Sequence, residues 1–385
     1  MKVLARLLPA RRAAFHDFAI RNGANSGVIR AGLRRVLGLH TLNQLQEYVA
    51  DFERSFAQYL GVAHAISQAS GTSALQLALR RAEVGPGTEV VTVANTWATT
   101  LTAVHALGGQ CRFVDIDPYT GLMDTNRLEK AITSKTVAIL PVHMYGSMAP
   151  MREIMSIARS NGIHVIEDAC QAIGAELDGR PAGSWGYAGC FSFHATKLVG
   201  APCDGGMVVT DDDALAESLR SDREVDWSLA LVETQPCVPS RLSPLAVPFL
   251  KANLGDLRRV VSRRQEQVAF YQQRLQGVRD VRLLVAPENV SSSHRNCILI
   301  SPHKAEILAT CQAKGLPVEE IYPALPQLVE RLQADGCRLS FTETLARDNL
   351  ALPLGDRVGR RMQARVIEVI RRASSTPQVV VSARG

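Results

Sequence analysis

Two apolar runs enclose a single lysine in the sequence Gly189-Cys190-Phe191-Ser192-Phe193-His194-Ala195-Thr196-Lys197-Leu198-Val199-Gly200, which continues through Cys203-Asp204-Gly205-Gly206 into Met207-Val208-Val209-Thr210. The runs predict two β-strands, and the small residues between them predict a turn. Lys197 is therefore expected at the end of a strand. An unprotonated amine in a desolvated pocket forms a Schiff base with a carbonyl group. A lone lysine after a strand is more often an exposed loop residue, so its role depends on other residues.

A carboxylate ends a second predicted strand, in His164-Val165-Ile166-Glu167-Asp168-Ala169-Cys170-Gln171. In α/β sheets, ligands bind at the carboxyl ends of the strands, so Asp168 is expected to point into a cleft. A pyridoxal phosphate ring needs an acidic partner for its pyridinium nitrogen, because the protonated ring is the electron sink. Asp168 fits that requirement, and a capping or turn carboxylate is the alternative.

A third element is the helix start Ser70-Gly71-Thr72-Ser73, which opens the run Ala74-Leu75-Gln76-Leu77-Ala78-Leu79-Arg80. Free backbone amides and the positive end of the helix dipole attract phosphate at such a start. An ordinary helix cap has a similar sequence. Together with Asp168 and Lys197, however, this start supplies the third contact that one cofactor would need.

From about residue 59 to residue 213, the chain resembles the DegT/DnrJ/EryC1/StrS family of pyridoxal-phosphate-dependent sugar aminotransferases. The similar segments occur in order: Ser70-Gly71-Thr72-Ser73-Ala74-Leu75, Glu89-Val90-Val91 with Thr96-Trp97, Phe113-Val114-Asp115-Ile116-Asp117, Leu140-Pro141-Val142-His143-Met144-Tyr145-Gly146, Glu167-Asp168-Ala169-Cys170-Gln171-Ala172, and the lysine segment. The resemblance implies the aspartate-aminotransferase-like α/β fold (fold type I), with a mainly parallel sheet in a large domain and a smaller α/β C-terminal domain.

The resemblance also implies roles for individual residues. Lys197 would carry the cofactor and move the proton, and Asp168 would meet the pyridine nitrogen. The remaining cofactor contacts would be Trp97 stacked on the ring, Gln171 near the ring hydroxyl, and Gly71, Thr72, Ser73 and Ser192 at the phosphate. The implied reaction moves an amino group from a donor such as glutamate or glutamine to a keto-sugar or keto-cyclitol, in sugar, antibiotic or cell-surface polysaccharide biosynthesis.

The pattern of apolar residues agrees with an α/β chain. An amphipathic helix is predicted over 41–60. Strands are predicted over 90–93, 112–115, 138–142 and 164–166, with helices over 99–107, 126–132 and 151–160 between them. This alternation predicts a mainly parallel sheet covered on both faces. In the last part of the chain, we expect helices over 254–275, 305–315 and 358–372, and a strand over 318–322.

The 385 residues, 46% of them apolar, are enough for a large core and at least two lobes. We expect a basic helical arm over 1–45, a large cofactor-binding domain over 46–250 and a small domain over 251–385. The eight cysteines lack paired short spacings, which argues against a zinc site and for a reducing compartment, so we expect a cytoplasmic protein. No apolar run has the length of a membrane span.

The positive charge is concentrated at the N-terminus. Eight of the first fifty residues are Lys or Arg against two acidic residues, and this excess equals the net charge of +6 of the whole chain. A solvated helix face explains the charge better than a nucleic-acid-binding arm, because no aromatic interleaving or basic recognition motif accompanies it.

The chain departs from the family pattern at Pro239. The resembling family usually carries an asparagine there, two residues before an arginine, on a loop that reaches the phosphate of the neighbouring subunit. Proline has no side-chain amide and no backbone donor. Arg241 is therefore the candidate for that contact in an expected homodimer, and an ordinary surface arginine is the alternative.

Two other functions stay open at this stage. A lyase or aromatising enzyme of the same fold, similar to aminohydroxybenzoate synthase, would also keep the lysine. A non-catalytic regulatory relative is the other alternative, suggested by Pro239 and the basic arm. The family's sugar dehydrases replace the lysine by histidine, so Lys197 argues against them.

Overall fold

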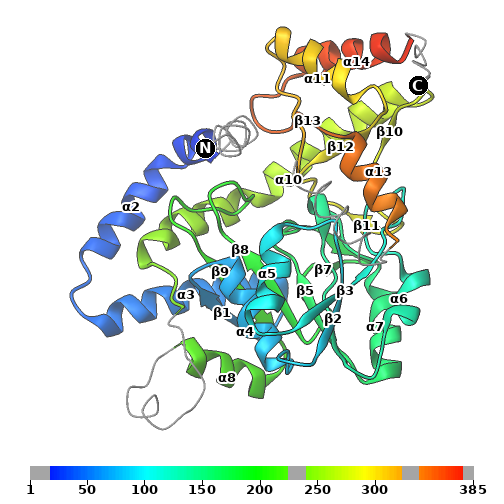
Figure 1. Cartoon of the computed structure of the whole chain (residues 1–385). Helices are drawn as coiled ribbons and strands as arrows, with labels where there is room; N and C mark the ends of the chain where they lie inside the picture. Colours follow the sequence, from blue (N-terminus) through cyan, green and yellow to red (C-terminus); the bar gives the residue numbers. More distant parts are fainter. Residues whose placement is uncertain (1–17, 224–239, 323–337, 376–385) are drawn as a thin grey trace, which may run out of the picture.

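A seven-stranded sheet forms the centre of the larger part of the molecule (Figure 1). The computed structural model describes residues 18–223, 240–322 and 338–375. The sheet contains β1 (His64–Gln68), β2 (Glu89–Val93), β3 (Gln110–Val114), β4 (Thr136–Ile139), β5 (His164–Asp168), β8 (Ala188–Ser192) and β9 (Gly206–Thr210). Their spatial order is β1-β9-β8-β5-β4-β2-β3. β9 pairs antiparallel with both of its neighbours, and every other adjacent pair is parallel. The predicted mainly parallel sheet is confirmed.

Helices cover both faces of this sheet. They are α3 (Leu42–Leu60), α4 (Gly71–Arg81), α5 (Ala98–Ala106), α6 (Thr125–Ala131), α7 (Met151–Asn161) and α8 (Asp213–Arg223). Val90 and Val91 show why the strands are apolar along their whole length. Both are fully buried, but Val90 packs in the core layer that contains α4 and α8, and Val91 packs in the opposite layer with α3 and α7. Successive side chains of a strand point to opposite faces of the sheet. When helices cover both faces, the side chains on both faces must be apolar.

Helix α3 supports the strand that leads to the lysine. It begins with a capping box between Thr41 and Gln44, and it ends at Gly61, which has a left-handed backbone. Phe56, fully buried on its inner face, makes edge-to-face contacts with the rings of Phe191 and Phe193, at centroid distances of 5.2 and 5.4 Å. These aromatic contacts fix the backbone on either side of Ser192.

A second, smaller sheet lies above the first in Figure 1. Its antiparallel strands are β10 (Arg282–Leu283), β12 (Cys297–Ile300) and β13 (Asn349–Leu352). It packs against α10 (Val247–Leu275), α11 (Lys304–Ala313) and α14 (Arg360–Ser375) in a separate apolar cluster, and α13 (Ser340–Asp348) precedes β13. A third sheet joins the two parts, because β11 (Val290–Ser291) pairs with β6 (Glu176–Leu177), which pairs with β7 (Arg180–Pro181).

Helix α10 connects the two larger sheets, and the expected domain boundary between residues 250 and 251 falls inside it. The helix predicted from residue 254 starts earlier, at Val247. Asn253 near its first end binds the carbonyl oxygen of Gly200 at 2.9 Å. Gln267 near its other end donates to the carbonyl oxygens of Gly355 and Val358 at 2.9 and 2.7 Å. The helix is therefore hydrogen-bonded to both parts of the molecule.

The strand predicted over 318–322 is wrong. Glu319 forms only an isolated bridge with Ala351. Tyr322 has a left-handed backbone with φ of 52°, which interrupts extended chain. The structure also contains two short 3₁₀ turns, η1 (Met144–Gly146) and η2 (Pro244–Ala246).

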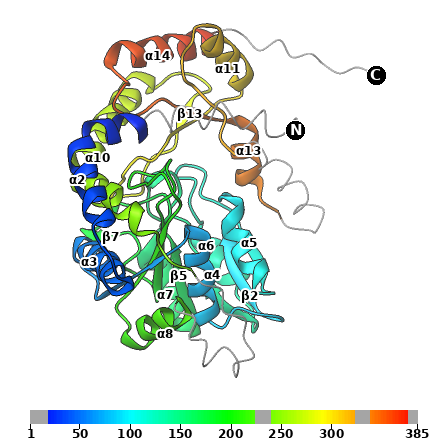
Figure 2. The ribbon, with the colours of Figure 1, turned by 90° about the vertical axis from the view of Figure 1, so that its left-hand side faces the viewer.

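The described part of the N-terminal arm is helical. Residues 18–24 form a helix that is followed by α2 (Ser26–Leu37). Helix α2 runs beside α10, as both views show (Figure 2). The contact is close at Gly32, where an added Cβ would lie 2.7 Å from Cβ of Pro248. Among the described residues, no helix is both long enough and apolar enough to cross a membrane.

Candidate active site

Lys197 lies in a tight turn just beyond β8. Its amide donates to the carbonyl oxygen of His194 at 2.8 Å, and the amide of Ala201 donates to the carbonyl oxygen of Phe193 at 3.0 Å. The residue keeps part of its surface accessible. Burial lowers the pKa of the Lys197 amine from its ordinary value, and the positive charge of Arg295 acts in the same direction. The uncharged form that a nucleophilic amine needs is therefore favoured.

Asp168 ends β5, the parallel neighbour of β8, in register with Cys190. Its side chain is buried, and two donors fix it: the hydroxyl of Thr100 binds Oδ2 at 2.7 Å and the amide of Cys170 binds Oδ1 at 3.1 Å. The negative charge of Asp168 opposes the lowering of the Lys197 pKa, which shows that the two groups interact. The structure thus brings the predicted lysine and aspartate to the ends of adjacent strands.

The start of α4 lies against these strand ends. Ser70 and Ser73 form a capping box, in which the Ser73 amide donates to Ser70 Oγ at 3.1 Å. An added Cβ at Gly71 would lie only 2.7 Å from Cβ of Ser192 and 3.1 Å from the sulfur of Cys170. Only glycine allows this approach, which places the helix start beside Ser192. Gly71, Thr72 and Ser192, all predicted at a phosphate, are therefore neighbours. The hydroxyl of Ser73 donates to the Ser70 carbonyl oxygen at 2.9 Å.

Two predicted ring contacts lie close to Tyr322, a residue that the sequence did not single out. Trp97 precedes α5, is 45% exposed, and makes an edge contact with the Tyr322 ring at a centroid distance of 5.9 Å. Gln171 donates from Nε2 to the Tyr322 hydroxyl at 2.8 Å. Tyr322 thus links Trp97 and Gln171 from the smaller part of the molecule.

Sequence reasoning also missed Thr100, Arg295 and Glu319. Thr100 could have been suspected from its spacing four residues after Thr96 at a helix start, and the Thr96 hydroxyl donates to the Thr100 hydroxyl at 2.8 Å. Burial raises the pKa of Glu319 to about 7, and the charge of Arg295 opposes this rise. Arg295 therefore lies close enough to affect the charges of both Lys197 and Glu319. No sequence motif indicated a role for Arg295.

Arg241 lies on the surface, just before η2. The preceding residue, Ser240, is buried and accepts a hydrogen bond from the amide of Ala69 at 3.1 Å. The Arg241 segment is thus anchored next to the start of α4 in its own chain. Pro239, the departure from the family pattern, lies outside the described residues.

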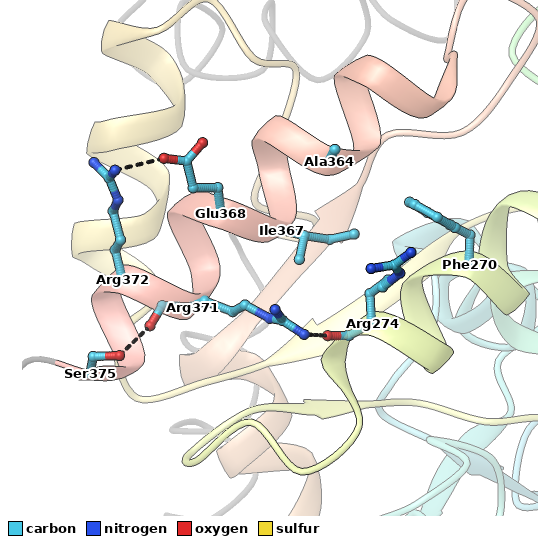
Figure 3. A pocket seen from close by; sticks show the side chains of 8 residues that line it. All are labelled: Phe270, Arg274, Ala364, Ile367, Glu368, Arg371, Arg372 and Ser375. Carbon is cyan, nitrogen blue, oxygen red and sulfur yellow. Dashed lines mark hydrogen bonds and ion pairs between the residues drawn. The ribbon is translucent and has the colours of Figure 1, made fainter.

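A cavity of about 510 Å³ between α10 and α14 lies elsewhere (Figure 3). Arg372 forms an ion pair with Glu368 at 2.7 Å, and Arg371 donates to the carbonyl oxygen of Arg274 at 2.6 Å. The cations at its wall already have protein partners, and neither Lys197 nor Asp168 lines it. The strand ends are the better candidate for an active site.

The fold and the site residues define an aspartate-aminotransferase-like α/β protein, in which an aspartate ends one strand and a lysine lies in the turn just beyond the adjacent strand. The family model described as the DegT/DnrJ/EryC1/StrS aminotransferase family matches residues 27–371. The chain belongs to this family.

Named relatives agree with the family. The chain is 36% identical over 323 residues to a UDP-N-acetyl-3-dehydro-alpha-D-glucosamine 3-aminotransferase of Acidithiobacillus ferrooxidans, covering 83% of this chain and 87% of that protein. It is 35% identical over 333 residues to a pleiotropic regulatory protein of Geobacillus stearothermophilus, covering 85% and 89%. The crystal structure of S. venezuelae DesV in complex with a ketimine intermediate has a TM-score of 0.86 and 31% identity, covering 94% and 98%. The predicted family, fold and aminotransferase class are confirmed.

Proposed function

We propose that this aminotransferase moves an amino group from glutamate or glutamine to a keto-sugar or keto-cyclitol, with pyridoxal phosphate as its cofactor. The observation that carries the proposal is the Lys197 amine, whose pKa burial lowers, beside the fixed carboxylate of Asp168. The sugar substrate rests on the relatives, one of which is named for a 3-dehydro nucleotide sugar. On the cysteine pattern, we place the reaction in the cytoplasm.

The residues at the strand ends fit the cofactor. Asp168 offers a buried carboxylate for a pyridinium nitrogen, and the close approach at Gly71 leaves the start of α4 free of a side chain where a phosphate would bind. Lys197 offers the amine, and Trp97, which is half exposed, offers a ring face. When bound, pyridoxal phosphate supplies an electron sink for charge on the substrate carbon.

The chain's own groups then have separate tasks. Lys197 accepts and returns a proton at Nζ, and its lowered pKa favours the uncharged amine that accepts the proton. Asp168 stays oriented, because Thr100 and the Cys170 amide each bind one of its carboxylate oxygens. Gln171, whose amide is fixed by Tyr322, faces the same end of the sheet.

Arg295 is our candidate for the carboxylate of the amino acid donor. Its charge acts on Lys197, on Glu319 and on Tyr322, which supports a position close to the reactive lysine. The turn that carries it is held against Gly146, where an added Cβ would lie 2.3 Å from the Arg295 amide nitrogen. A guanidinium binds a carboxylate through two parallel hydrogen bonds.

We also propose that the protein is a homodimer in which Arg241 approaches the phosphate site of the partner subunit. A phosphate dianion needs more than a helix start, and an arginine supplies a charged donor. Ser240 lies against Ala69 of its own chain, so a contact within one chain must be distinguished from one between chains.

Mixing two inactive or weakened variants makes that distinction. In a mixed dimer, the Arg241→Ala chain keeps Lys197 and the Lys197→Ala chain keeps Arg241. These two native residues meet in one site only if Arg241 acts across the interface. Recovery of native cofactor affinity in the mixture supports the proposal. Weak binding in every mixed site, or an active monomer in sedimentation, would contradict it.

The reaction itself is tested with purified protein, pyridoxal phosphate, glutamate or glutamine, and a panel of nucleotide keto-sugars and keto-inositols, with products identified by mass. We expect an amino product from the native protein and none from Lys197→Ala. Borohydride reduction should attach the cofactor at Lys197. An aromatic or eliminated product would favour the lyase alternative, and a bound cofactor without turnover of any donor would favour the regulatory one.

A further inference from the structure

The carbonyl groups of the Lys197 turn are bound by an arginine of the N-terminal arm and by an asparagine of α10. Arg21, in the helix over 18–24, donates from Nη2 to the Lys197 carbonyl oxygen at 3.0 Å and from Nη1 to the Leu198 carbonyl oxygen. Its side chain is only 2% exposed, although it carries a full charge. Arg21 lies before residue 27, where the match to the family model begins.

Asn253 of α10 completes this support. It donates from Nδ2 to the Gly200 carbonyl oxygen at 2.9 Å and to Oδ1 of Asn22 at 3.3 Å, and it is also 2% exposed. Asn22 is in turn oriented by its own bond to the Phe18 carbonyl oxygen at 2.9 Å. Three carbonyl groups of the turn over 197–200 are therefore fixed by a helix of the arm and by α10.

The turn has no room to relax away from these donors. An added Cβ at Gly200 would lie 2.7 Å from the His194 carbonyl oxygen, so the chain is already folded tightly on itself. The arm is also held firmly, since α2 packs closely on α10 at Gly32 and Pro248. A buried guanidinium is costly unless its donors are used, and here a fork of two donors spans two consecutive carbonyl groups.

We propose that Arg21 is a positioning residue for Lys197: it fixes the main chain of the turn and thereby aims the lysine side chain toward Asp168. Arg21 acts on the Lys197 carbonyl oxygen and contacts neither substrate nor cofactor. The inference rests on the proposed function, in which Lys197 is the reactive lysine. It gives the basic arm a task in the active site of its own chain.

The test compares Arg21→Met, which keeps the length of the side chain but removes both donors, with Arg30→Met, a change at an exposed arginine of the same arm. Hydrogen exchange is measured on the full-length protein without cofactor. We expect amides over 194–201 to exchange about tenfold faster or more in Arg21→Met, the factor expected from the loss of one charge-assisted hydrogen bond. Arg30→Met should match the native protein, and peptides from β5 should not change.

The protein with pyridoxal phosphate bound gives a second readout. In Arg21→Met, the pH midpoint of the cofactor absorbance should shift and kcat should fall while KM for the sugar stays constant, because Arg21 does not touch substrate. Arg21→Lys keeps the charge but cannot span both carbonyl groups, so its exchange rate, absorbance midpoint and kcat should lie between those of the native protein and of Arg21→Met. If Arg21→Met does not fold, Arg21→Lys replaces it in both measurements.

Native exchange over 194–201 in the Arg21 variants, or an equal change in Arg30→Met, would overturn the inference, even if Lys197→Ala is inactive. If the Arg21 variants exchange faster over 194–201 but Lys197→Ala is fully active, Arg21 does fix the turn, and it is the proposed function of Lys197 that is contradicted. Faster exchange with an unchanged absorbance midpoint and kcat would show that Arg21 only stabilises the turn, and would also overturn the inference.

Discussion

Gly71→Ala tests whether the start of α4 holds the cofactor. The new Cβ would lie 2.7 Å from Cβ of Ser192, about 0.7 Å short of ordinary van der Waals contact, which begins at 3.4 Å. Both atoms belong to short side chains fixed to the backbone, so the helix start or the end of β8 must move. Overpacking of this kind costs about 1–3 kcal/mol. We expect the unfolding free energy to fall by this amount of about 1–3 kcal/mol. We also expect pyridoxal phosphate to bind more weakly, because the helix start that would hold its phosphate is displaced.

The assay is a titration of cofactor-free protein with pyridoxal phosphate, followed by absorbance, with thermal unfolding measured in parallel. Gly85→Ala is the matched control, because its added Cβ would have its nearest neighbour at 3.9 Å. Adding Ser192→Gly to Gly71→Ala removes the closest contact and should restore part of the lost thermal stability. A folded Gly71→Ala protein with native cofactor affinity, or the same loss in Gly85→Ala, would refute the reasoning.

Asp168→Asn should keep the cofactor bound but slow the half-reaction with glutamate by about 10²- to 10³-fold, since it removes a charge matched to the transition state; an unimpaired single turnover would contradict this. Thr100→Val removes a donor to Asp168 at nearly constant volume and should slow the same step by about tenfold, the effect of one hydrogen bond to a charged group, whereas a native rate would show that Thr100 does not matter. Without cofactor, the native protein should gain stability over Lys197→Met as pH rises toward 10.5, the ordinary lysine pKa, because the folded state, with its lowered pKa, binds fewer protons there than the unfolded chain. A difference in urea-unfolding free energy between the two proteins that stays constant as pH rises to 10.5 would argue against a buried amine.

Local patterns in the sequence predicted much of the fold. The strands before and after Lys197 are β8 and β9, the predicted helix over 41–60 is α3, and the predicted helix start at residues 70–73 opens α4. Each depends on neighbours in sequence: apolar periodicity, a capping pair, or small residues in a turn. Asp168 and Lys197 could be brought together for the same reason, because the carboxyl ends of parallel strands share one edge of a sheet.

The partners of these residues could not be predicted in the same way. Arg21 contacts a turn 176 residues further along the chain, and an arginine in a basic helix has no local signature of burial. Tyr322 meets Gln171 only because the two parts of the molecule pack together. The expected strand over 318–322 failed for a related reason, since apolar spacing does not reveal a left-handed residue at Tyr322.

Helix α10 acts mechanically as a lever arm. Asn253 and Gln267 are fourteen residues apart, about 21 Å along a helix that rises 1.5 Å per residue. Tilting such a rod by about 5° displaces its far end by about 2 Å, which is more than a hydrogen bond tolerates. The bonds of Asn253 to Gly200 and of Gln267 to Gly355 and Val358 therefore constrain one another. A hinge motion of the smaller sheet about the larger one must bend this rod or break a bond at one end, so the orientation of the smaller sheet and the geometry of the lysine turn are mechanically coupled.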